Sequence, residues 1–129
     1  MKPIFTILLA LCLPLAGADK DKSLPTDFKS LKALAEKGDA RAQKELGLKY
    51  AKGAGVQQDF EEAMKWWRIS ADQGYAGAQS NLGLMYYKGE GVEQDFKEAL
   101  KWYRKAVEQG DAVAQNNLGI MYAKGEGVS

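Results

Sequence analysis

The sequence predicts an all-α fold, a solenoid in which antiparallel helix pairs stack side by side. The segment AQKELGLKYAKGAGVQQDFEEAMKWW, which begins at Ala42, recurs as AQSNLGLMYYKGEGVEQDFKEALKWY at Ala78. A third copy opens at Ala114, so each copy starts 36 residues after the previous one. Residues 42–77 and 78–113 are identical at 21 of 36 positions. A repeat of this length, in which apolar residues recur at helical spacing, is typical of stacked helical units.

The first half of each repeat is expected to form a helix. In the second copy Ala78, Leu82 and Tyr86 are four residues apart, so they share one face of a helix that we expect from Ala76 to Lys88. The segment Gly-Glu-Gly-Val follows, and its two glycines can adopt the backbone angles that a tight reversal needs. The chain is therefore expected to turn back after this helix.

The second half of each repeat is expected to form the antiparallel partner helix. Asp95 can cap the free backbone N–H groups at its start, and Glu98 can reach back to complete a capping box. Asp59 and Glu62 repeat this pair in the first copy. Gly110 stands where a left-handed residue is expected after the end of the helix.

Glycine also occurs inside the first helix of each repeat, at Gly47, Gly83 and Gly119. A glycine there costs about 1 kcal/mol relative to alanine, so a compensating gain is expected. We expect the gain to be the close approach of a neighbouring helix. The core between the helices is expected to contain the large aromatic residues Trp66, Trp67, Trp102 and Tyr103.

The chain before the repeats divides into three segments. Residues 1–18 have one positive charge, an apolar stretch of 12 residues and a small-residue end, which is the pattern of a secretory signal peptide. As a helix this stretch would be about 18 Å long, too short for the roughly 30 Å hydrocarbon core of a membrane. Residues 19–26 are expected to form a flexible, solvated leader. Residues 27–41 are expected to form a half-repeat that caps the first full unit.

The predicted array contains about 2.5 repeats and about five helices, besides the cleaved signal helix. Repeat 1 spans residues 42–77, repeat 2 spans residues 78–113, and a truncated repeat 3 spans residues 114–129. The helix that opens repeat 3 is not followed by a partner helix, so we expect exposed apolar area at this open C-terminal end. Self-association through this end is one expected use of the surface.

Composition excludes several kinds of site. The only cysteine, Cys12, lies in the predicted signal peptide, and the chain has no histidine, so neither a disulfide nor a zinc or copper site is expected. Residues 19–129 contain equal numbers of acidic and basic residues, which gives no electrostatic footprint for nucleic acid or for an anionic membrane surface. No membrane insertion is expected after signal cleavage. No histidine can activate the serines, and the glycine pairs follow helices rather than strands. No cofactor or catalytic residue is predicted.

The string A-Q-x-x-L-G-x-x-Y-x-x-G-x-G-V-x-x-D-F-x-x-A-x-x-W resembles the Sel1-like repeat, a relative of the tetratricopeptide repeat. The resemblance covers residues 42–129 almost without a gap. It implies a right-handed superhelix of antiparallel helix pairs and a role as an adaptor in protein complexes. Exported bacterial members act in the cell envelope or in host contact. Some exported relatives hold each helix pair with a disulfide, and this chain departs from them because it lacks the cysteines.

The first helices of successive units usually line the concave face of a helical repeat array, where bound peptides run. Asparagine can grip the backbone of an extended peptide, and methionine offers adaptable apolar contacts. Packing of the methionines between helices is the alternative. From the aligned positions three and seven residues after each starting alanine we predict a partner-binding set of Glu45, Lys49, Asn81, Met85, Asn117 and Met121.

The sequence therefore predicts a non-enzymatic adaptor that is exported, periplasmic or secreted, and that binds a protein or peptide through its concave face. A periplasmic immunity protein that neutralises a toxic effector is the alternative within the binding class. A cell-wall-active hydrolase is the rival of another class, and the absence of an identifiable nucleophile disfavours it.

Overall fold

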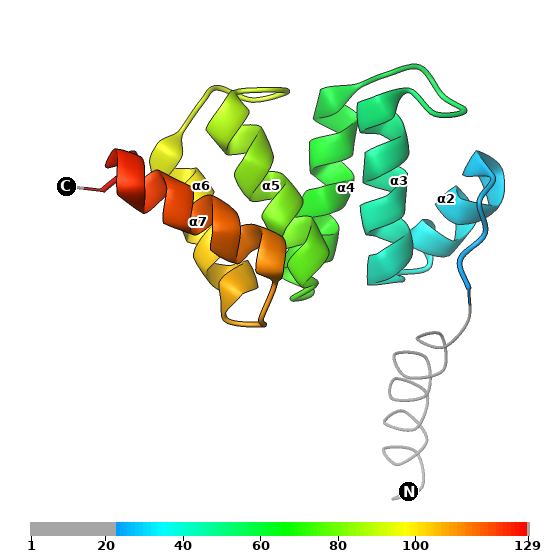
Figure 1. The fold of residues 1–129 in the computed structure, drawn as a ribbon. Helices are drawn as coiled ribbons and strands as arrows, with labels where there is room; N and C mark the ends of the chain where they lie inside the picture. Colours follow the sequence, from blue (N-terminus) through cyan, green and yellow to red (C-terminus); the bar gives the residue numbers. More distant parts are fainter. Residues whose placement is uncertain (1–22, 129) are drawn as a thin grey trace, which may run out of the picture.

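The computed structural model describes residues 23–128, which form six α-helices and no strand. The predicted signal peptide and the first part of the predicted leader lie outside the described residues. The helices follow one another along a single array from α2 to α7 (Figure 1). Their bounds are Phe28–Glu36 for α2, Ala40–Lys52 for α3, Phe60–Asp72 for α4, Ala76–Lys88 for α5, Phe96–Val107 for α6 and Ala112–Lys124 for α7.

The helices pair as the repeat predicts, and the all-α solenoid is confirmed. Repeat 1 contains α3 and α4, repeat 2 contains α5 and α6, and α7 is the first helix of repeat 3. The helix expected from Ala76 to Lys88 has these same bounds as α5. Six helices are described where about five were expected, and the half-repeat contributes the shortest of them, α2. Each helix packs against the next one in the chain, and α5 also touches α7.

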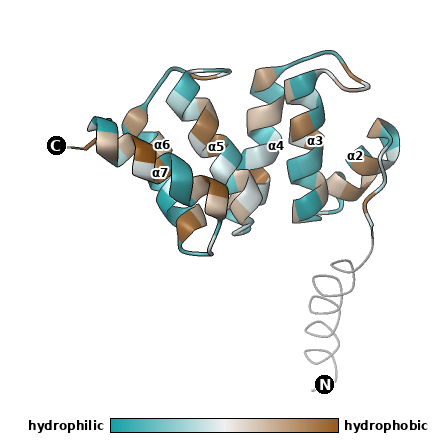
Figure 2. Ribbon diagram, viewed as in Figure 1, coloured by the Kyte–Doolittle hydropathy of each residue, from teal (hydrophilic) through white to brown (hydrophobic). Residues whose placement is uncertain are grey.

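The interior of the array consists of three hydrophobic clusters that follow one another along the chain. Figure 2 shows both hydrophobic and hydrophilic residues along each helix. The cluster between α2 and α3 is centred on Leu31 and Leu46, the middle cluster on Trp67 and Leu82, and the last cluster on Tyr103. Trp67, Trp102 and Tyr103 are all buried, so the expectation that aromatic residues fill the core is confirmed for these three.

Aspartate begins five of the six described helices, and in each case its carboxylate accepts a hydrogen bond from a backbone N–H of the first turn. The reciprocal bond of the expected capping box is not formed at α6. The backbone N–H of Asp95 donates to the carbonyl oxygen of Tyr86 at 2.9 Å, while a Glu98 carboxylate oxygen lies 3.7 Å from Lys101 Nζ. The preceding helix, rather than the glutamate, therefore satisfies this backbone donor.

Gly47 permits the close helix contact that its position predicts. A β carbon at this residue would lie 2.5 Å from Nε1 of Trp67, well inside van der Waals contact. The indole N–H of Trp67 also donates a hydrogen bond of 2.9 Å to the carbonyl oxygen of Lys44, so the ring is fixed across α3. At Gly119 no heavy atom lies within 4 Å of the corresponding β carbon position. Close approach is confirmed in repeat 1 and is not present at Gly119.

Buried glutamines link consecutive units, a feature that the sequence analysis did not anticipate. Gln79 Nε2 donates to the carbonyl oxygen of Ala71 near the end of α4, at 3.2 Å. Gln109 Nε2 in turn donates to Gln79 Oε1 at 2.9 Å. Gln43 makes the same contacts one repeat earlier, with Ala35 and Gln73. Each glutamine therefore joins the end of one second helix to the end of the next.

The last residues of the predicted leader do not extend freely into solvent. Residues 23–26 are neither helix nor strand, and Leu24 packs against the cluster that contains Leu31 and Leu46. Because Leu24 aligns with Phe60 of repeat 1, it supplies apolar contact at a place where the full repeat has a helix. The described end of this segment thus belongs to the packed fold.

Candidate binding groove of the first helices

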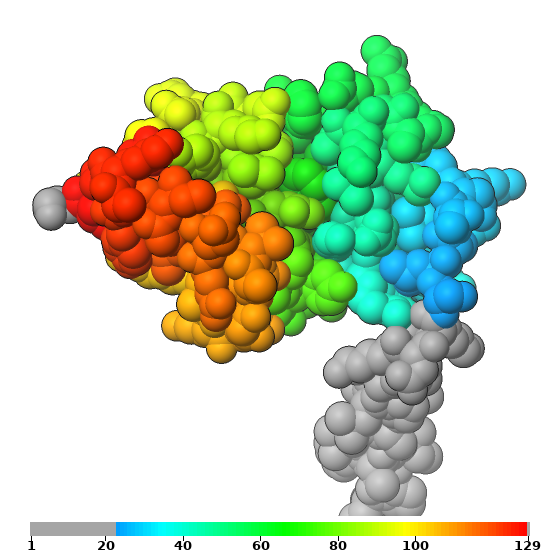
Figure 3. All heavy atoms as spheres, viewed as in Figure 1, coloured from blue at the N-terminus to red at the C-terminus, as the bar shows by residue number. Residues whose placement is uncertain are grey.

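A groove lies between two successive first helices, α5 and α7. It encloses a cavity of about 250 Å³. The space-filling view shows α7 beside α5 on this face of the molecule (Figure 3). We call this site the α5–α7 groove and define it by its lining residues, which are Leu84, Tyr87, Lys88, Tyr103, Asn117, Ile120 and Lys124.

A second cavity, of about 470 Å³, lies beside α3 at the other end of the array. Its wall includes Glu45, Leu48 and Lys52, which lie 72 residues before Asn117, Ile120 and Lys124 of the α5–α7 groove. The same row of helix positions therefore faces both cavities. At α3 the opposite wall is formed by residues 23–26 and by Leu31 rather than by another first helix.

Three of the six predicted partner-binding residues line a cavity, and the other three do not. Glu45 and Lys49 line the α3 cavity, and Asn117 lines the α5–α7 groove. Glu45 is also in contact with Lys44, whose Nζ lies 3.0 Å from its carboxylate. The structure thus places three of the six residues at the surface of a cavity, although not all in the same one.

The two methionines lie in the core. Met85 is 5% exposed and Met121 is 1% exposed, and each belongs to a hydrophobic cluster. Both methionines are covered by the second helix that precedes their own helix, α4 for Met85 and α6 for Met121. The second helix that precedes α3 is α2, which begins one turn later relative to the repeat and does not reach the equivalent position. The aligned residue in repeat 1, Lys49, consequently remains at the surface. These two methionines therefore pack between helices, and the expectation that they contact a partner at the surface is corrected.

Asn81 and Asn117 occupy equivalent positions but have different surroundings. Asn117 Nδ2 donates to the hydroxyl oxygen of Tyr103 at 3.3 Å. The aligned aromatic residue in repeat 1 is Trp67, whose only polar group is a donor. Asn81 Nδ2 is buried and has no hydrogen-bond partner among the described residues. The two asparagines therefore do not offer a partner the same hydrogen-bonding groups.

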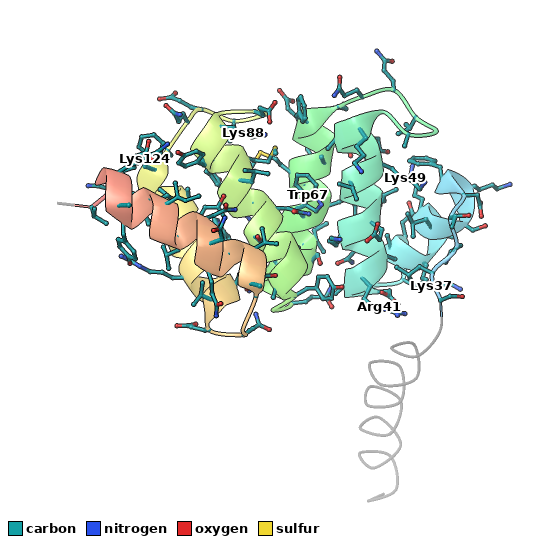
Figure 4. All side chains as sticks on the ribbon, in the orientation of Figure 1. Lys37, Arg41, Lys49, Trp67, Lys88 and Lys124 are labelled. Atoms are coloured by element: carbon teal, nitrogen blue, oxygen red, sulfur yellow. The ribbon has the colours of Figure 1, made fainter. Side chains whose placement is uncertain are left out.

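The apolar and cationic residues of the groove were not among the partner-binding residues predicted from the sequence. Leu84 and Ile120 are equivalent positions in successive first helices, and so are Lys88 and Lys124. The sequence does contain this pattern, because in all three repeats a leucine or isoleucine of the first helix is followed four residues later by a lysine. Figure 4 shows Lys88 and Lys124, which lie at the C-terminal ends of α5 and α7 respectively.

Two titrating groups among residues 23–128 have shifted pKa values. Burial raises the pKa of the Tyr103 phenol to about 12, and the nearby Tyr87 adds to this rise, while the hydrogen bond from Asn117 opposes it. The backbone and side-chain hydrogen bonds of Ser30 lower the pKa of the exposed Asp27 carboxylate. The floor of the α5–α7 groove therefore holds a neutral hydroxyl group at physiological pH.

Residues 23–128 contain no group of three or more histidine, cysteine, aspartate and glutamate side chains that could hold a metal ion. None of the helices in this part of the chain has the length and apolar character required to cross a membrane. The α5–α7 groove, with its two lysines, two tyrosines, one asparagine and two aliphatic residues, has the chemistry of a binding surface.

Comparison of the sequence with known repeat families identifies the units of the array. The model of the Sel1 repeat matches residues 40–75, 76–111 and 112–129. The chain belongs to the Sel1 repeat family. The three Sel1 units keep the period of 36 residues and begin two residues before the boundaries that the sequence analysis assigned.

Solved structures of Sel1-type proteins from bacteria resemble this chain. A protective antigen present in uropathogenic Escherichia coli strains, displaying an SLR fold, is 47% identical with a TM-score of 0.78, over 81% of this chain and 22% of that one. A Sel1 repeat protein from Oxalobacter formigenes is 39% identical with a TM-score of 0.74, over 79% of this chain and 43% of that one. Helicobacter pylori cysteine rich protein B is 26% identical with a TM-score of 0.67, over 70% of this chain and 68% of that one. No curated protein matches the sequence.

The chain spans less than half the length of the first two of these relatives. Sel1 repeats commonly mediate protein–protein interactions, and proteins of this family are generally non-catalytic adaptors.

Proposed function

We propose that this chain is a non-enzymatic adaptor of the bacterial cell envelope that binds a protein or peptide along its first helices. The α5–α7 groove is the observation that carries the proposal. Its residues come from two successive repeats, so a partner lying in it would contact the array rather than a single helix pair. Ile120 is 41% exposed, an apolar side chain at the groove surface that a partner could cover.

Photo-crosslinking in intact cells tests the binding part of this proposal. A photoreactive amino acid replaces Ile120 in one variant and Lys88 in another, since both residues line the groove. Matched variants carry it at Lys97 and Glu61, which are exposed on the second helices α6 and α4. We expect one discrete crosslinked protein from the groove positions and none from the matched positions. Equal crosslinking from all four positions, or none from the groove, would contradict the proposal.

The envelope part of the proposal is supported by the signal-peptide pattern of residues 1–18. Cell fractionation followed by N-terminal sequencing tests it directly. We expect the periplasmic or secreted protein to start near Asp19. A chain that keeps Met1 and stays in the cytoplasm would contradict the envelope location without affecting the groove.

A further inference from the structure

We propose that the α5–α7 groove binds an extended peptide segment in which acidic residues flank an apolar residue. This inference rests on the proposed function, because it names the chemistry of the partner in the same groove. The apolar side chain would enter the cavity, and the carboxylates would pair with Lys88 and Lys124.

The size of the cavity favours single side chains over a small-molecule ligand. Pockets for small molecules usually have volumes of about 300–1,000 Å³. The cavity between α5 and α7 has about 250 Å³, and the apolar residues Leu84 and Ile120 line it together with the ring of Tyr103. This space suits one or two side chains of a peptide that lies across the helices.

The charge around the cavity favours acidic residues in the peptide. Lys88 and Lys124 line it together with no carboxylate, and neither lysine forms an ion pair within residues 23–128. The nearby carboxylate of Glu126 accepts a hydrogen bond from the Tyr87 hydroxyl at 2.8 Å and does not line the cavity. Because opposite charges attract across a partly desolvated surface, two unpaired ammonium groups select carboxylates.

Basic residues also outnumber acidic residues on the remaining first helix, α3. Together α3, α5 and α7 contain six basic residues and one acidic residue, Glu45. The complete chain has a formal net charge of only +1, so positive charge is concentrated on these helices relative to the rest of the molecule. An acidic segment would therefore be attracted to the first helices before it reaches the groove.

The equivalent row on α3 already faces a non-helical segment of this chain. Residues 23–26 line the α3 cavity beside Leu48 and Lys52, the counterparts of Ile120 and Lys124. Leu24 of that segment packs into the adjoining hydrophobic cluster. The array thus contains one example of a non-helical peptide, with a leucine turned into the core, lying against this row of positions.

Asn117 provides a polar contact for the backbone of such a peptide. Its Nδ2 is occupied by the bond to the Tyr103 hydroxyl, and no described residue donates to its Oδ1. An extended peptide has backbone N–H groups that can donate to this oxygen. The groove therefore combines an apolar cavity, two cationic groups and one side-chain oxygen that can accept a hydrogen bond from the backbone of a peptide.

Fluorescence anisotropy with a synthetic peptide of alternating glutamate and leucine tests this inference. The protein is the chain from residue 19 to residue 129. We expect saturable binding that weakens as salt concentration rises. The double variant K88Q/K124Q is expected to bind about tenfold more weakly, a loss typical of two charge pairs at an interface. The variant Ile120→Ser is also expected to bind more weakly, and its exposed position makes it compatible with folding.

The matched control is the double variant K29Q/K97Q, which removes the same charge from exposed positions on α2 and α6. We expect its affinity to equal that of the unchanged chain within about twofold. An equal loss in this control would overturn the inference in favour of a general charge effect. Equal binding of a peptide in which serine replaces every leucine, or of duplex DNA, would overturn it in favour of a polyanion surface.

This experiment separates the inference from the proposed function. If the unchanged chain does not bind the glutamate–leucine peptide while groove positions still crosslink a protein in cells, the chemistry inferred here is wrong and the adaptor proposal stands. If the peptide binds at the groove and no protein is crosslinked in cells, the inference stands and the proposed function is contradicted.

Discussion

Gly83 lies directly against the ring of Tyr103, so closely that a β carbon at residue 83 would lie 2.7 Å from Tyr103 Cδ1. The flat ring thus occupies the place that a side chain on α5 would need. This contact lets α5 and α6 approach, and it holds Tyr103 at 1% exposure in the floor of the α5–α7 groove. Gly119, one repeat later, has the same sequence position and no such neighbour.

The first prediction compares alanine substitutions at these two glycines. Gly83→Ala is expected to lower the free energy of unfolding by about 1–3 kcal/mol, because the methyl group forces the ring or the helices apart. Gly119→Ala is expected to raise it by up to about 1 kcal/mol, since alanine is the better helix former and the added methyl meets nothing. Urea unfolding followed by circular dichroism measures both. Destabilisation of similar size at both positions would show that helix approach is not the reason for the glycines.

The second prediction concerns the glutamines that link the repeats. Gln79→Leu keeps the side-chain volume but removes the bond to the Ala71 carbonyl and leaves the Gln109 amide without its acceptor. We expect a loss of about 1–3 kcal/mol from these two hydrogen bonds. The matched variant is Gln115→Leu, at the equivalent and exposed position of α7, where we expect a change within about 0.5 kcal/mol. Equal stability of the two variants in urea would contradict a structural role for the glutamine link.

The third prediction concerns the aspartate caps. The Asp111 carboxylate accepts a hydrogen bond of 2.9 Å from the backbone N–H of Ala114 at the start of α7. Asp111→Ala is expected to cost about 1 kcal/mol, whereas Asp111→Asn keeps an acceptor and is expected to cost much less. Thermal unfolding of the two variants distinguishes the hydrogen bond from the negative charge. A larger loss in the asparagine variant than in the alanine variant would exclude the cap as the cause.

The sequence predicted the helices accurately because their signals are local. The apolar spacing and the glycine turns lie within one repeat. The bounds Ala76–Lys88 follow from these two signals, although α5 begins after Tyr75 without a side-chain cap. The predicted contact residues depended on which side of a helix its neighbours cover. Met85 and Lys49 share one repeat position, yet one is buried and the other lies at a cavity because α4 is longer than α2. Such differences arise from packing between repeats, which spacing within one repeat does not encode.

The chemistry of the groove also depends on packing between repeats. Asn117 was recognised as a surface residue, but its side chain is oriented by the Tyr103 hydroxyl, which comes from the preceding repeat. Asn81 lacks that partner because repeat 1 has Trp67 at the position of Tyr103. Two residues with the same sequence context therefore differ in chemistry, and only the packed helices reveal the difference.

The last prediction concerns stability at high pH. The ordinary pKa of tyrosine is about 10, and burial raises that of Tyr103 to about 12 in the folded chain. Between these values the folded state keeps the phenol proton while the unfolded state loses it, so the unfolded state binds fewer protons. The free energy of unfolding should therefore fall as pH rises from about 10 to about 12, by up to about 1.4 kcal/mol for each pH unit.

Tyr103→Phe isolates this effect from the titration of the other groups, because they titrate alike in both proteins. Urea unfolding at a series of pH values should show a steeper loss of stability in the unchanged chain than in the phenylalanine variant. Below about pH 10 the difference between the two proteins should be constant, and it should reflect the lost hydrogen bond from Asn117. Parallel stability curves up to about pH 12 would mean that the phenol titrates as in the unfolded chain, and that the floor of the groove is open to water.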